Sequence, residues 1–339
     1  MDNSVYENLT VQYCFPDNNA SCRKEVRTGP VYIFLFIVLS CISVCTVILN
    51  LLVIISISHF KQLHTPTNLL ILSLAVADLL VGLIIMPGNI MQLMDSCWYL
   101  GKLACFIFPL VTSLSVLASV FSLLFIAVDR YIAVCDPLLY PRKITVCKIS
   151  LCIILGWSTC VFYNIIFFYF NEHLTPAQLH ITCYGECVVV IKHSWLIFDF
   201  LLSFVIPFSV ILVLYALIFN VARHQAKAFR AVTNGVSNTK ESKVSGSSET
   251  KAAKKLSFVI LVYLICWVPY YLSSLSVENV TTSTMVWIVF GWLMFFNSSM
   301  NPIIYAILYQ WFRVSVKHIM TCRIFESSSS WFNLISDPV

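Results

Sequence analysis

The chain has 339 residues, of which 59% are apolar and 11% are charged, and its formal net charge is +5. A soluble domain is about 45–50% apolar and about 25% charged, so this composition excludes a water-soluble globule and a disordered chain. One membrane domain with small polar ends is the expected organisation. Residues 1–29 have no basic start followed by a short apolar stretch, so no cleavable signal peptide is expected.

Seven apolar runs follow in chain order, and each is long enough to cross a membrane, because a spanning helix needs about 20 mostly apolar residues. They cover residues 30–58, 67–94, 102–135, 146–170, 190–222, 253–276 and 285–308. The sequence therefore predicts an all-α membrane protein, a seven-transmembrane helix bundle. The Ser- and Lys-rich insert Ala222–Lys255, between the fifth and sixth runs, is predicted to be flexible.

The distribution of Lys and Arg predicts the orientation of the bundle. With the N-terminus outside, 16 basic residues lie on the inner side and 5 on the outer side, in agreement with the positive-inside rule. The net charge then follows mostly from topology, and nucleic-acid binding is a poor interpretation. Residues 310–321 mix aromatic and basic side chains, which is typical of a helix at the membrane interface. The predicted domains are an extracellular N-terminus (1–29), a seven-transmembrane domain (30–308), an interfacial helix (309–322) and a cytoplasmic tail (323–339).

The fourteen cysteines divide by the side of the membrane on which they fall. Eight lie in spans or inside and are expected to be free; among these, Cys322 is either palmitoylated or an unmodified thiol. Two outer N-x-S/T matches, Asn8 and Asn19, are expected to be glycosylated. The six outer cysteines can form disulfides, but their spacing does not choose among 15 pairings. These six are Cys14, Cys22, Cys97, Cys105, Cys183 and Cys187.

Three carboxylates lie within the predicted spans, where a central charge costs about 2.5–3.5 kcal/mol. Asp78 lies in the second span, Asp129 begins the triplet Asp129-Arg130-Tyr131 at the inner end of the third, and Asp199 lies in the fifth. Each is expected to face the interior of the bundle. Asp78 and polar residues of nearby spans either hold a small cation or only join the helices by hydrogen bonds. These polar residues are Asn50, Ser119, Asn297, Ser298 and Asn301.

Characteristic motifs recur along the spans, and their order is more specific than any one of them. They are Asn50, the Asp78 segment, Cys105, Asp129-Arg130-Tyr131, Trp157, Pro207, Tyr215, Cys266-Trp267-Val268-Pro269 and Asn301-Pro302-Ile303-Ile304-Tyr305. Three further segments are His64-Thr65-Pro66-Thr67-Asn68, Cys183-Tyr184-Gly185-Glu186-Cys187 and the run from Asn297 to Phe312. The first set resembles the rhodopsin-like G-protein-coupled receptors, and the second resembles the trace amine-associated receptors among them.

The resemblance implies a receptor, not an enzyme. It implies sensing of small protonated amines, mostly in the plasma membrane of olfactory neurons and their sensory cilia, with signalling through a stimulatory G protein and cAMP. Arrestin is a further expected partner. The resemblance also implies the disulfides Cys105–Cys187 and Cys22–Cys183.

The same resemblance assigns two clusters of polar residues inside the bundle. Asp129 and Arg130, with Tyr215 and Tyr305, form the expected activation switch. Glu249 either pairs with Arg130 in the resting state or is a solvated loop charge. No cofactor is expected apart from an allosteric sodium ion, whose expected ligands are Asp78, Ser119, Asn297 and Asn301.

The sequence departs from the usual amine receptor at the position of the amine anchor. Most such receptors have an aspartate eighteen residues before the arginine of the Asp-Arg-Tyr motif, and this chain has Thr112 there. Asp199 lies eight residues before Pro207, about 12 Å along the helix, at the depth where ligands bind in this fold. The chain thus resembles the subgroup in which the amine-binding aspartate lies in helix V instead of helix III.

An ion pair between Asp199 and an ammonium gains roughly 4–5 kcal/mol at 3–4 Å and an effective dielectric near 20, before desolvation costs. Ser203, one turn inward, is expected to bond to Asp199 or to the ligand. The rest of the ligand is expected to cross towards Thr112, Ser113 and Val116. Aromatic residues either form a cation–π wall around it or only pack together; they are Trp267, Tyr270, Tyr271, Trp292 and Phe295.

Several alternatives remain at this point. Glu186 in an outer loop either attracts a second amino group, which favours diamines, or is a solvated acid. Asp199 is either the ligand anchor or a buried structural acid, in which case the receptor binds a neutral small molecule or a peptide. A transporter is disfavoured because no repeated halves are present. A metal-dependent hydrolase is disfavoured because the seven histidines lie in loops or near span ends.

Overall fold

The computed structural model describes residues 12–25, 27, 29–171, 183–187, 191–233, 261–275, 285–326 and 328–334. Asn8 and Glu249, two residues of the sequence predictions, lie outside the described residues. The described part is helical apart from turns and two isolated bridges, which join Tyr13 to Arg23 and Ser21 to Tyr184. The predicted all-α fold class is confirmed.

The helices follow one another in the order that the apolar runs predict. In chain order they are α1 (Pro30–His59), α2 (Pro66–Leu80), η2 (Val81–Ile85), α3 (Met86–Met94), α4 (Gly101–Cys135), α5 (Tyr140–Lys143), α6 (Val146–Phe170), α7 (His193–Asp199), η4 (Phe200–Val205), α8 (Ile206–Thr233), the helix Leu261–Leu275, α10 (Met285–Leu308) and α11 (Gln310–Met320). Three short 3-10 turns, η1 (Lys61–Leu63), η6 (Arg323–Phe325) and η7 (Ser329–Trp331), lie near one end of the bundle.

Local sequence fixes where helices begin. Pro30 and Pro66 occupy the first position of α1 and α2, where the missing N–H costs no hydrogen bond. The side chain of Thr65 accepts a 3.3 Å hydrogen bond from the N–H of Asn68 and so caps α2. The starts of α1 and α2 are thereby set by residues next to the apolar runs.

Five of the described helices are long and apolar enough to cross a membrane: Pro30–His59, Pro66–Met94, Gly101–Cys135, Val146–Phe170 and His193–Gln225. The helix Leu261–Leu275 is apolar but shorter, and α10 has 24 residues. Their outward sides carry large exposed apolar residues such as Phe34, Ile154, Phe162 and Val213. Such a surface suits lipid and would be unstable in water.

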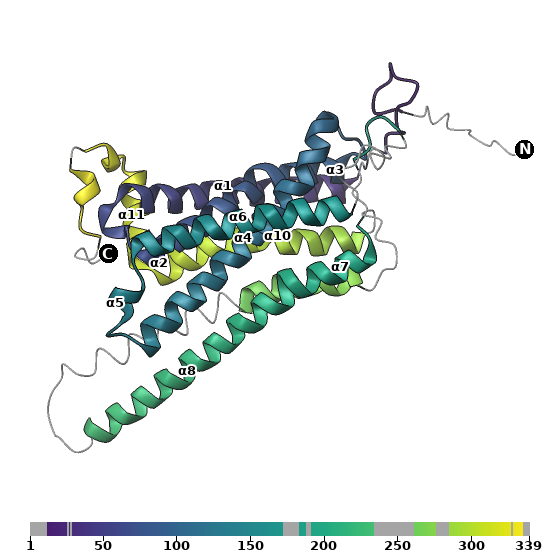
Figure 1. Cartoon of the computed structure of the whole chain (residues 1–339). Helices are drawn as coiled ribbons and strands as arrows, with labels where there is room; N and C mark the ends of the chain where they lie inside the picture. Colours follow the sequence, from purple (N-terminus) through teal and green to yellow (C-terminus); the bar gives the residue numbers. More distant parts are fainter. Residues whose placement is uncertain are drawn as a thin grey trace, which may run out of the picture.

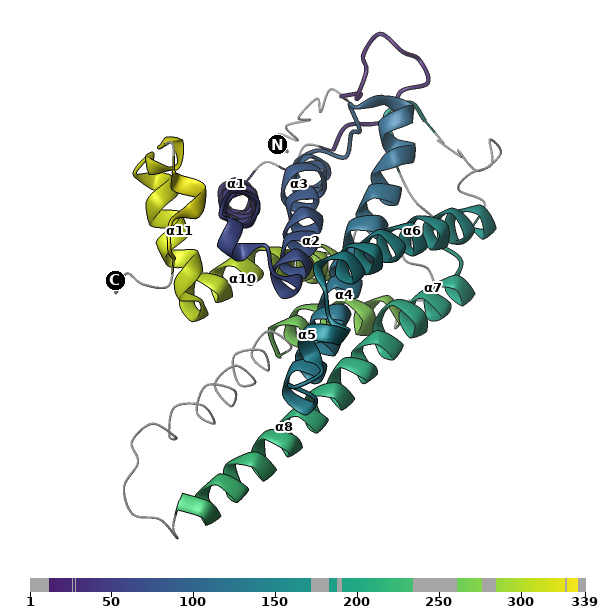
Figure 2. The same ribbon diagram turned by 60° about the vertical axis from the view of Figure 1, so that its left-hand side comes forward.

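Helix α4 lies at the centre of the bundle and packs against α2, α6 and α8 (Figures 1 and 2). Helix α8 continues to Thr233 and projects beyond its neighbours in both views. The apolar segment capable of spanning the membrane is His193–Gln225, close to the predicted fifth span 190–222, and the helix itself continues beyond it. The polar residues of the insert can extend α8 because a helix that leaves the bundle needs no apolar face.

Two spans contain π-helical turns that the apolar pattern did not predict. The turn η2 separates Asp78 from α3, and η4 begins directly after Asp199. A π turn inserts a residue into an α-helix, so that the side chains after it are rotated by about 100°. The faces that α3 and α8 present to the interior therefore differ from those of uninterrupted α-helices.

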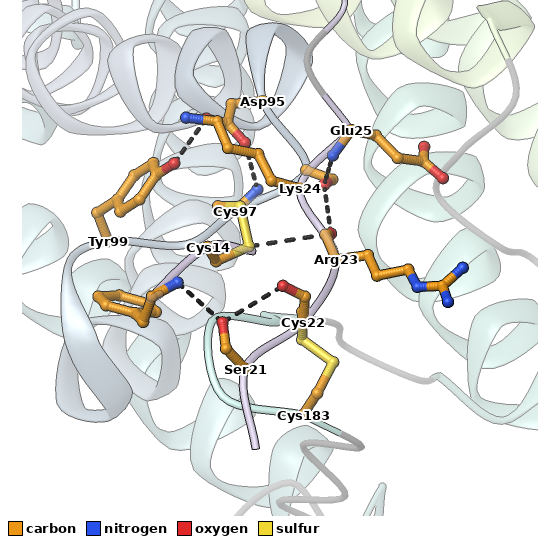
Figure 3. The surroundings of a disulfide bond; sticks show 12 residues. Cys14, Ser21, Cys22, Arg23, Lys24, Glu25, Asp95, Cys97, Tyr99 and Cys183 are labelled. Carbon is orange, nitrogen blue, oxygen red and sulfur yellow. Dashed lines mark hydrogen bonds and ion pairs between the residues drawn. A yellow bond between two sulfur atoms is a disulfide. The ribbon is translucent and has the colours of Figure 1, made fainter. Parts of the chain in front are cut away.

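The face of the bundle that carries residues 12–25, here called the N-terminal face, is closed by three disulfides. They join Cys14 to Cys97, Cys22 to Cys183, and Cys105 to Cys187. The last two are the pairings that the resemblance implied, and the first was left open by the sequence. Figure 3 shows how the first two bridges hold one short segment from both sides.

Hydrogen bonds join the same three segments of the N-terminal face. The N–H of Trp98 donates to the carbonyl of Gly185 at 2.7 Å, and the N–H of Tyr184 donates to the carbonyl of Ala20 at 2.6 Å. Gly185 has a φ of +103°, and a Cβ there would lie 2.9 Å from the Cβ of Cys14. Only glycine fits this turn without strain, so the segments meet closely because of its small size.

A charged cluster lies beside the Cys14–Cys97 bridge (Figure 3). Lys24 Nζ is 3.0 Å from Oδ2 of Asp95, and the Tyr99 hydroxyl donates to the same oxygen at 2.6 Å. The hydrogen bond with Asp95 raises the pKa of Lys24. Burial is the main reason that the pKa of Tyr99 is also raised. Both groups therefore stay protonated, and they hold the carboxylate between them.

At the opposite end, here called the C-terminal face, the chain after α11 folds back onto η1. Leu334 is fully buried, and its N–H donates to Oε1 of Gln62 at 2.9 Å. Ser329 is 2.9 Å from Nε2 of His59, and Lys61 Nζ lies 4.0 Å from the centre of the Trp331 ring. Residues 329–334 are thus docked on the turn between α1 and α2.

Candidate functional site

A cavity of about 300 Å³ opens between α3, α4, α6, α7, η4, the helix Leu261–Leu275 and α10. Nine of the ten predicted ligand-binding residues line it: Thr112, Ser113, Val116, Asp199, Ser203, Trp267, Tyr270, Tyr271 and Phe295. Trp292 is not among the lining residues. It packs edge-on against Phe295 at 6.0 Å, in the same core cluster, and is 9% exposed.

Asp199 ends α7, and its carboxylate lies at the wall of the cavity. Ser203, four residues further on in η4, donates a 2.8 Å hydrogen bond to Oδ1. The Tyr163 hydroxyl on α6 donates to the same oxygen at 2.7 Å, and the Tyr271 hydroxyl lies 3.4 Å from Oδ2. In the part of the chain that the structure describes, Asp199 forms no salt bridge. The carboxylate is therefore oriented by neutral hydroxyls that leave its negative charge uncompensated.

Sequence reasoning did not predict the contact of Tyr163 with Asp199. It lies in the apolar sequence of α6, and nothing in its spacing indicates a partner on another helix. Its ring stacks on Phe167 at 5.8 Å, which fixes the hydroxyl in the direction of Asp199. Only the packing of α6 beside α7 and η4 brings the two residues together.

Thr112 on α4 stands where most amine receptors have the aspartate that binds the amine, and its hydroxyl already makes a hydrogen bond. Thr112 Oγ1 donates a 2.8 Å hydrogen bond to the carbonyl of Phe108 one turn earlier on α4. Among the described residues that line the cavity, the only carboxylate is that of Asp199. Of these residues, Asp199 alone can neutralise the charge of a cationic group.

Aromatic rings form the floor of the cavity and extend from it into the core. Trp267 stacks on Tyr271 at 6.0 Å and on Tyr263 at 5.1 Å. Tyr263 in turn stacks on Phe208 at 5.8 Å, with an angle of 9° between the rings. The face of an aromatic ring attracts a cation, so the floor complements the carboxylate at the wall.

Asp78 lies in a second, fully buried cluster deeper in the bundle. Ser119 Oγ donates to its Oδ1 at 3.1 Å, and Asn301 Nδ2 donates to its Oδ2 at 2.8 Å. Asn297 is buried on α10, one turn before Asn301. Asn50 Oδ1, also buried, has no hydrogen-bond partner within the described residues. The atoms that could coordinate an ion are the oxygens of the Asp78 carboxylate, the Ser119 hydroxyl and the asparagine amides. A hard cation prefers oxygen ligands, and so the residues fit a sodium ion.

The Asp129-Arg130 pair forms a third cluster, at the C-terminal face. Arg130 Nη2 is 2.6 Å from Oδ2 of Asp129, and the guanidinium also donates to Thr67 Oγ1. Tyr140 donates to Oδ1 of Asp129 at 2.9 Å. Burial is the main reason that the pKa of Tyr140 is raised, and its hydroxyl therefore remains a donor. The aspartate thus holds Arg130 in a network that joins α2, α4 and α5.

Two other predicted switch residues, Tyr215 and Tyr305, are buried as well. Tyr215 packs among Ala127, Ile211 and Ile218 on α4 and α8. Tyr305 on α10 lies 5.9 Å from the Tyr309 ring, edge to face. Tyr215 and Tyr305 thus belong to different packing clusters.

Comparison with known proteins agrees with this architecture. Residues 49–305 match the seven transmembrane receptor family (rhodopsin family). The protein is therefore a membrane receptor of the G-protein-coupled class, which is not a class of enzymes. It crosses the plasma membrane several times, and a G protein is its partner.

Full-length relatives narrow the class. Trace amine-associated receptor 13c of Danio rerio is 40% identical, with 99% of this chain and 100% of that protein covered. Trace amine-associated receptor 6 is 39% identical in Rattus norvegicus, with 97% of both chains covered, and 38% identical in Homo sapiens, with 98% of both covered. The chain belongs to the trace amine-associated receptors.

Proposed function

We propose that this receptor binds a small protonated amine and that Asp199, at the end of α7 in the fifth span, is the group that binds the ammonium. One observation carries the proposal: the only carboxylate among the described residues that line the cavity is held by three neutral hydroxyls. A buried negative charge without a counter-ion is unstable, and a ligand cation supplies the missing charge. The family name of the relatives points to the same ligand class.

Amine-evoked cAMP in cells that express Asp199→Asn tests this proposal. The amide keeps the shape of the side chain but removes its charge, so the response to every amine in a panel is expected to fall at least a hundredfold. Asp95→Asn is the matched control, because Asp95 lies outside the cavity beside Cys97. Surface amounts must be equal, which antibody staining of an N-terminal tag measures.

A receptor for a neutral molecule or a peptide is the alternative, and the same three hydroxyl contacts give it a basis. A fully hydrogen-bonded carboxylate can act as a structural link between helices. In that case Asp199→Asn leaves the potency of the ligand unchanged. Neutral analogues with the shape of the amines then evoke the same response as the amines themselves.

For signalling, we infer a stimulatory G protein and cAMP. The Asp129-Arg130 network at the C-terminal face supports a resting state in which Arg130 is withheld from a cytoplasmic partner. We also propose arrestin as a second partner, an olfactory role, and residence in sensory cilia; these follow from the family. A stimulatory G protein predicts that cAMP rises when an amine is applied, and a fall in cAMP would contradict it.

We propose that the N-terminus is extracellular and that Asn8 and Asn19 carry glycans. Asn19 is an exposed turn residue, as a glycan requires. We also propose that Cys322 carries palmitate; it is an exposed free thiol directly after α11. Glycosidase treatment should change the electrophoretic mobility of the protein, and Cys322→Ser should abolish incorporation of labelled palmitate.

We propose sodium as an allosteric ligand of the cluster formed by Asp78, Ser119, Asn297 and Asn301. When bound, the ion would neutralise the Asp78 carboxylate between α2, α4 and α10. In wild-type membranes, replacement of sodium by choline should change the affinity for the amine. Asp78→Asn should remove that difference, and a difference that persists in this variant would contradict the proposal.

A further inference from the structure

Two carboxamide side chains line the cavity on α3, where no ligand-binding role was predicted. Asn89 and Gln92 are three residues apart and therefore lie on one face of the helix. Both are half-buried. They follow the π turn η2, which changes the face that α3 presents to the interior, and this explains why the sequence pattern did not reveal them.

The hydrogen bonds within the described residues leave polar groups of both side chains available to a ligand. Asn89 Nδ2 donates to the carbonyl of Ile85 at 2.8 Å, so its Oδ1 is the atom left for another donor. Within the described residues, the Gln92 amide makes no hydrogen bond. A carboxamide offers an acceptor and two donors, and polar groups of this kind in an apolar cavity fix the orientation of a ligand.

The carboxamides and the carboxylate belong to different sides of the cavity. Helix α3 is well separated from α7 in both overall views (Figures 1 and 2). A ligand whose nitrogen is bound at Asp199 therefore directs its other end towards α3.

The charges of the residues that line the cavity determine which chemical group the ligand can carry at the end remote from Asp199. Asp199 is the only charged residue among the described residues that line the cavity, so a second ammonium near α3 would have no counter-ion among them. Glu186 lines a separate, smaller hollow with Lys102, Phe15 and Trp98, and not this cavity. A charge without a partner is costly to bury, whereas a hydroxyl or an amide meets groups with which it can bond.

We propose that the ligand is a monoamine with a neutral hydrogen-bonding group, such as a hydroxyl, at the end remote from the nitrogen, and that Asn89 and Gln92 recognise this group. The inference rests on the proposed function, because Asp199 sets the direction of the ligand. It makes Asn89 and Gln92 specificity-determining residues. It also excludes diamines as the preferred ligands.

Three series of amines with matched chain lengths test the proposal: n-alkylamines, terminal amino alcohols and terminal diamines. At the best length, the amino alcohol is expected to be about tenfold more potent than the alkylamine, since one net hydrogen bond contributes about that factor. The diamine is expected to be weaker than the amino alcohol. Potency is read as the cAMP EC50 in cells with equal surface amounts of receptor.

Gln92→Leu and Asn89→Ala are each expected to reduce the preference for the amino alcohol. Gln12→Leu is the matched control, because Gln12 is exposed on the N-terminal segment. Gln92→Glu gives an independent gain of function: the new carboxylate is expected to make the diamine the most potent of the three. This variant keeps the test decisive if the apolar replacements fail to reach the surface.

The outcomes separate the two proposals. If the amines act, and Asp199→Asn abolishes their action, but the hydroxyl gives no advantage in the wild type, only the further inference is overturned. A preference that persists in both Gln92→Leu and Asn89→Ala overturns it as well, and so does a diamine that is the most potent ligand of the wild type. If no amine acts, the proposed function and the inference fail together.

Discussion

The Tyr163 hydroxyl on α6 donates a 2.7 Å hydrogen bond to Oδ1 of Asp199 on α7. Ser203 donates to the same oxygen at 2.8 Å, so Oδ1 accepts two short bonds, while Oδ2 has only the longer contact with Tyr271 at 3.4 Å. The two oxygens of the carboxylate are therefore unequal. Oδ2 is the oxygen that a ligand ammonium can approach by displacing the weakest of the three contacts.

Tyr163→Phe is expected to raise the EC50 of amines about tenfold. A hydrogen bond to a charged group contributes about 1.5–3 kcal/mol, and Ser203 retains part of the orientation of Asp199. Tyr169→Phe is the control, because Tyr169 lies on the same helix but is 59% exposed. The measurement is a cAMP dose-response curve at equal surface amounts. An unchanged EC50 for Tyr163→Phe would show that Asp199 needs no support from α6.

Removal of the Cys14–Cys97 bridge should lower the stability of the receptor. The bridge closes a separation of 83 residues, and a disulfide of this kind typically contributes about 2–4 kcal/mol. The double variant Cys14→Ser/Cys97→Ser is therefore expected to melt at a lower temperature in detergent than the wild type. Cys41→Ser, which removes an exposed free thiol on α1, is the control and should melt like the wild type. Equal melting temperatures for all three proteins would contradict a stabilising role.

The sequence predicts the bundle well because membrane insertion depends on composition and length, both of which are local properties. Each long apolar run can be recognised from its own stretch of sequence, without knowledge of the rest of the chain. The same holds for the Asp-Arg-Tyr motif and for the isolated Asp199. From its position relative to Pro207, Asp199 was expected at the depth where ligands bind in this fold, and the structure has it at the wall of the cavity.

Contacts between distant helices could not be predicted in this way. Tyr163 is one of many aromatic residues in α6, and its role depends on the packing of α6 beside Asp199. Asn89 and Gln92 follow a π turn, whose extra residue changes the helical register without a sequence signal. Helical periodicity likewise did not show which aromatic residues of α10 line the cavity, where Phe295 does and Trp292 does not.

Tyr140→Phe should raise the cAMP level in the absence of ligand. The Tyr140 hydroxyl donates to Oδ1 of Asp129 at 2.9 Å, and Asp129 in turn binds Arg130. Loss of one donor leaves the carboxylate less firmly held, so Arg130 is released more often and basal cAMP is expected to rise about twofold to threefold. Lys143→Ala is the control, since it breaks the exposed pair of Lys143 with Asp136, which contributes little. If both variants have the basal cAMP of the wild type, the network does not restrain Arg130.

Leu334→Asp should release the docked tail without unfolding the bundle. Leu334 is fully buried in a cluster with Phe60 and Phe312, and a buried charge without a partner costs several kcal/mol, which exceeds the contribution of the few hydrogen bonds of the tail. Amide hydrogen exchange of residues 329–334 is therefore expected to become fast, while exchange in α1 and α2 stays slow. Phe325→Asp serves as the control because Phe325 is 87% exposed, and it should leave the exchange of the tail unchanged. Protection of residues 329–334 that is the same in Leu334→Asp as in the wild type would mean that Leu334 does not hold the tail on η1.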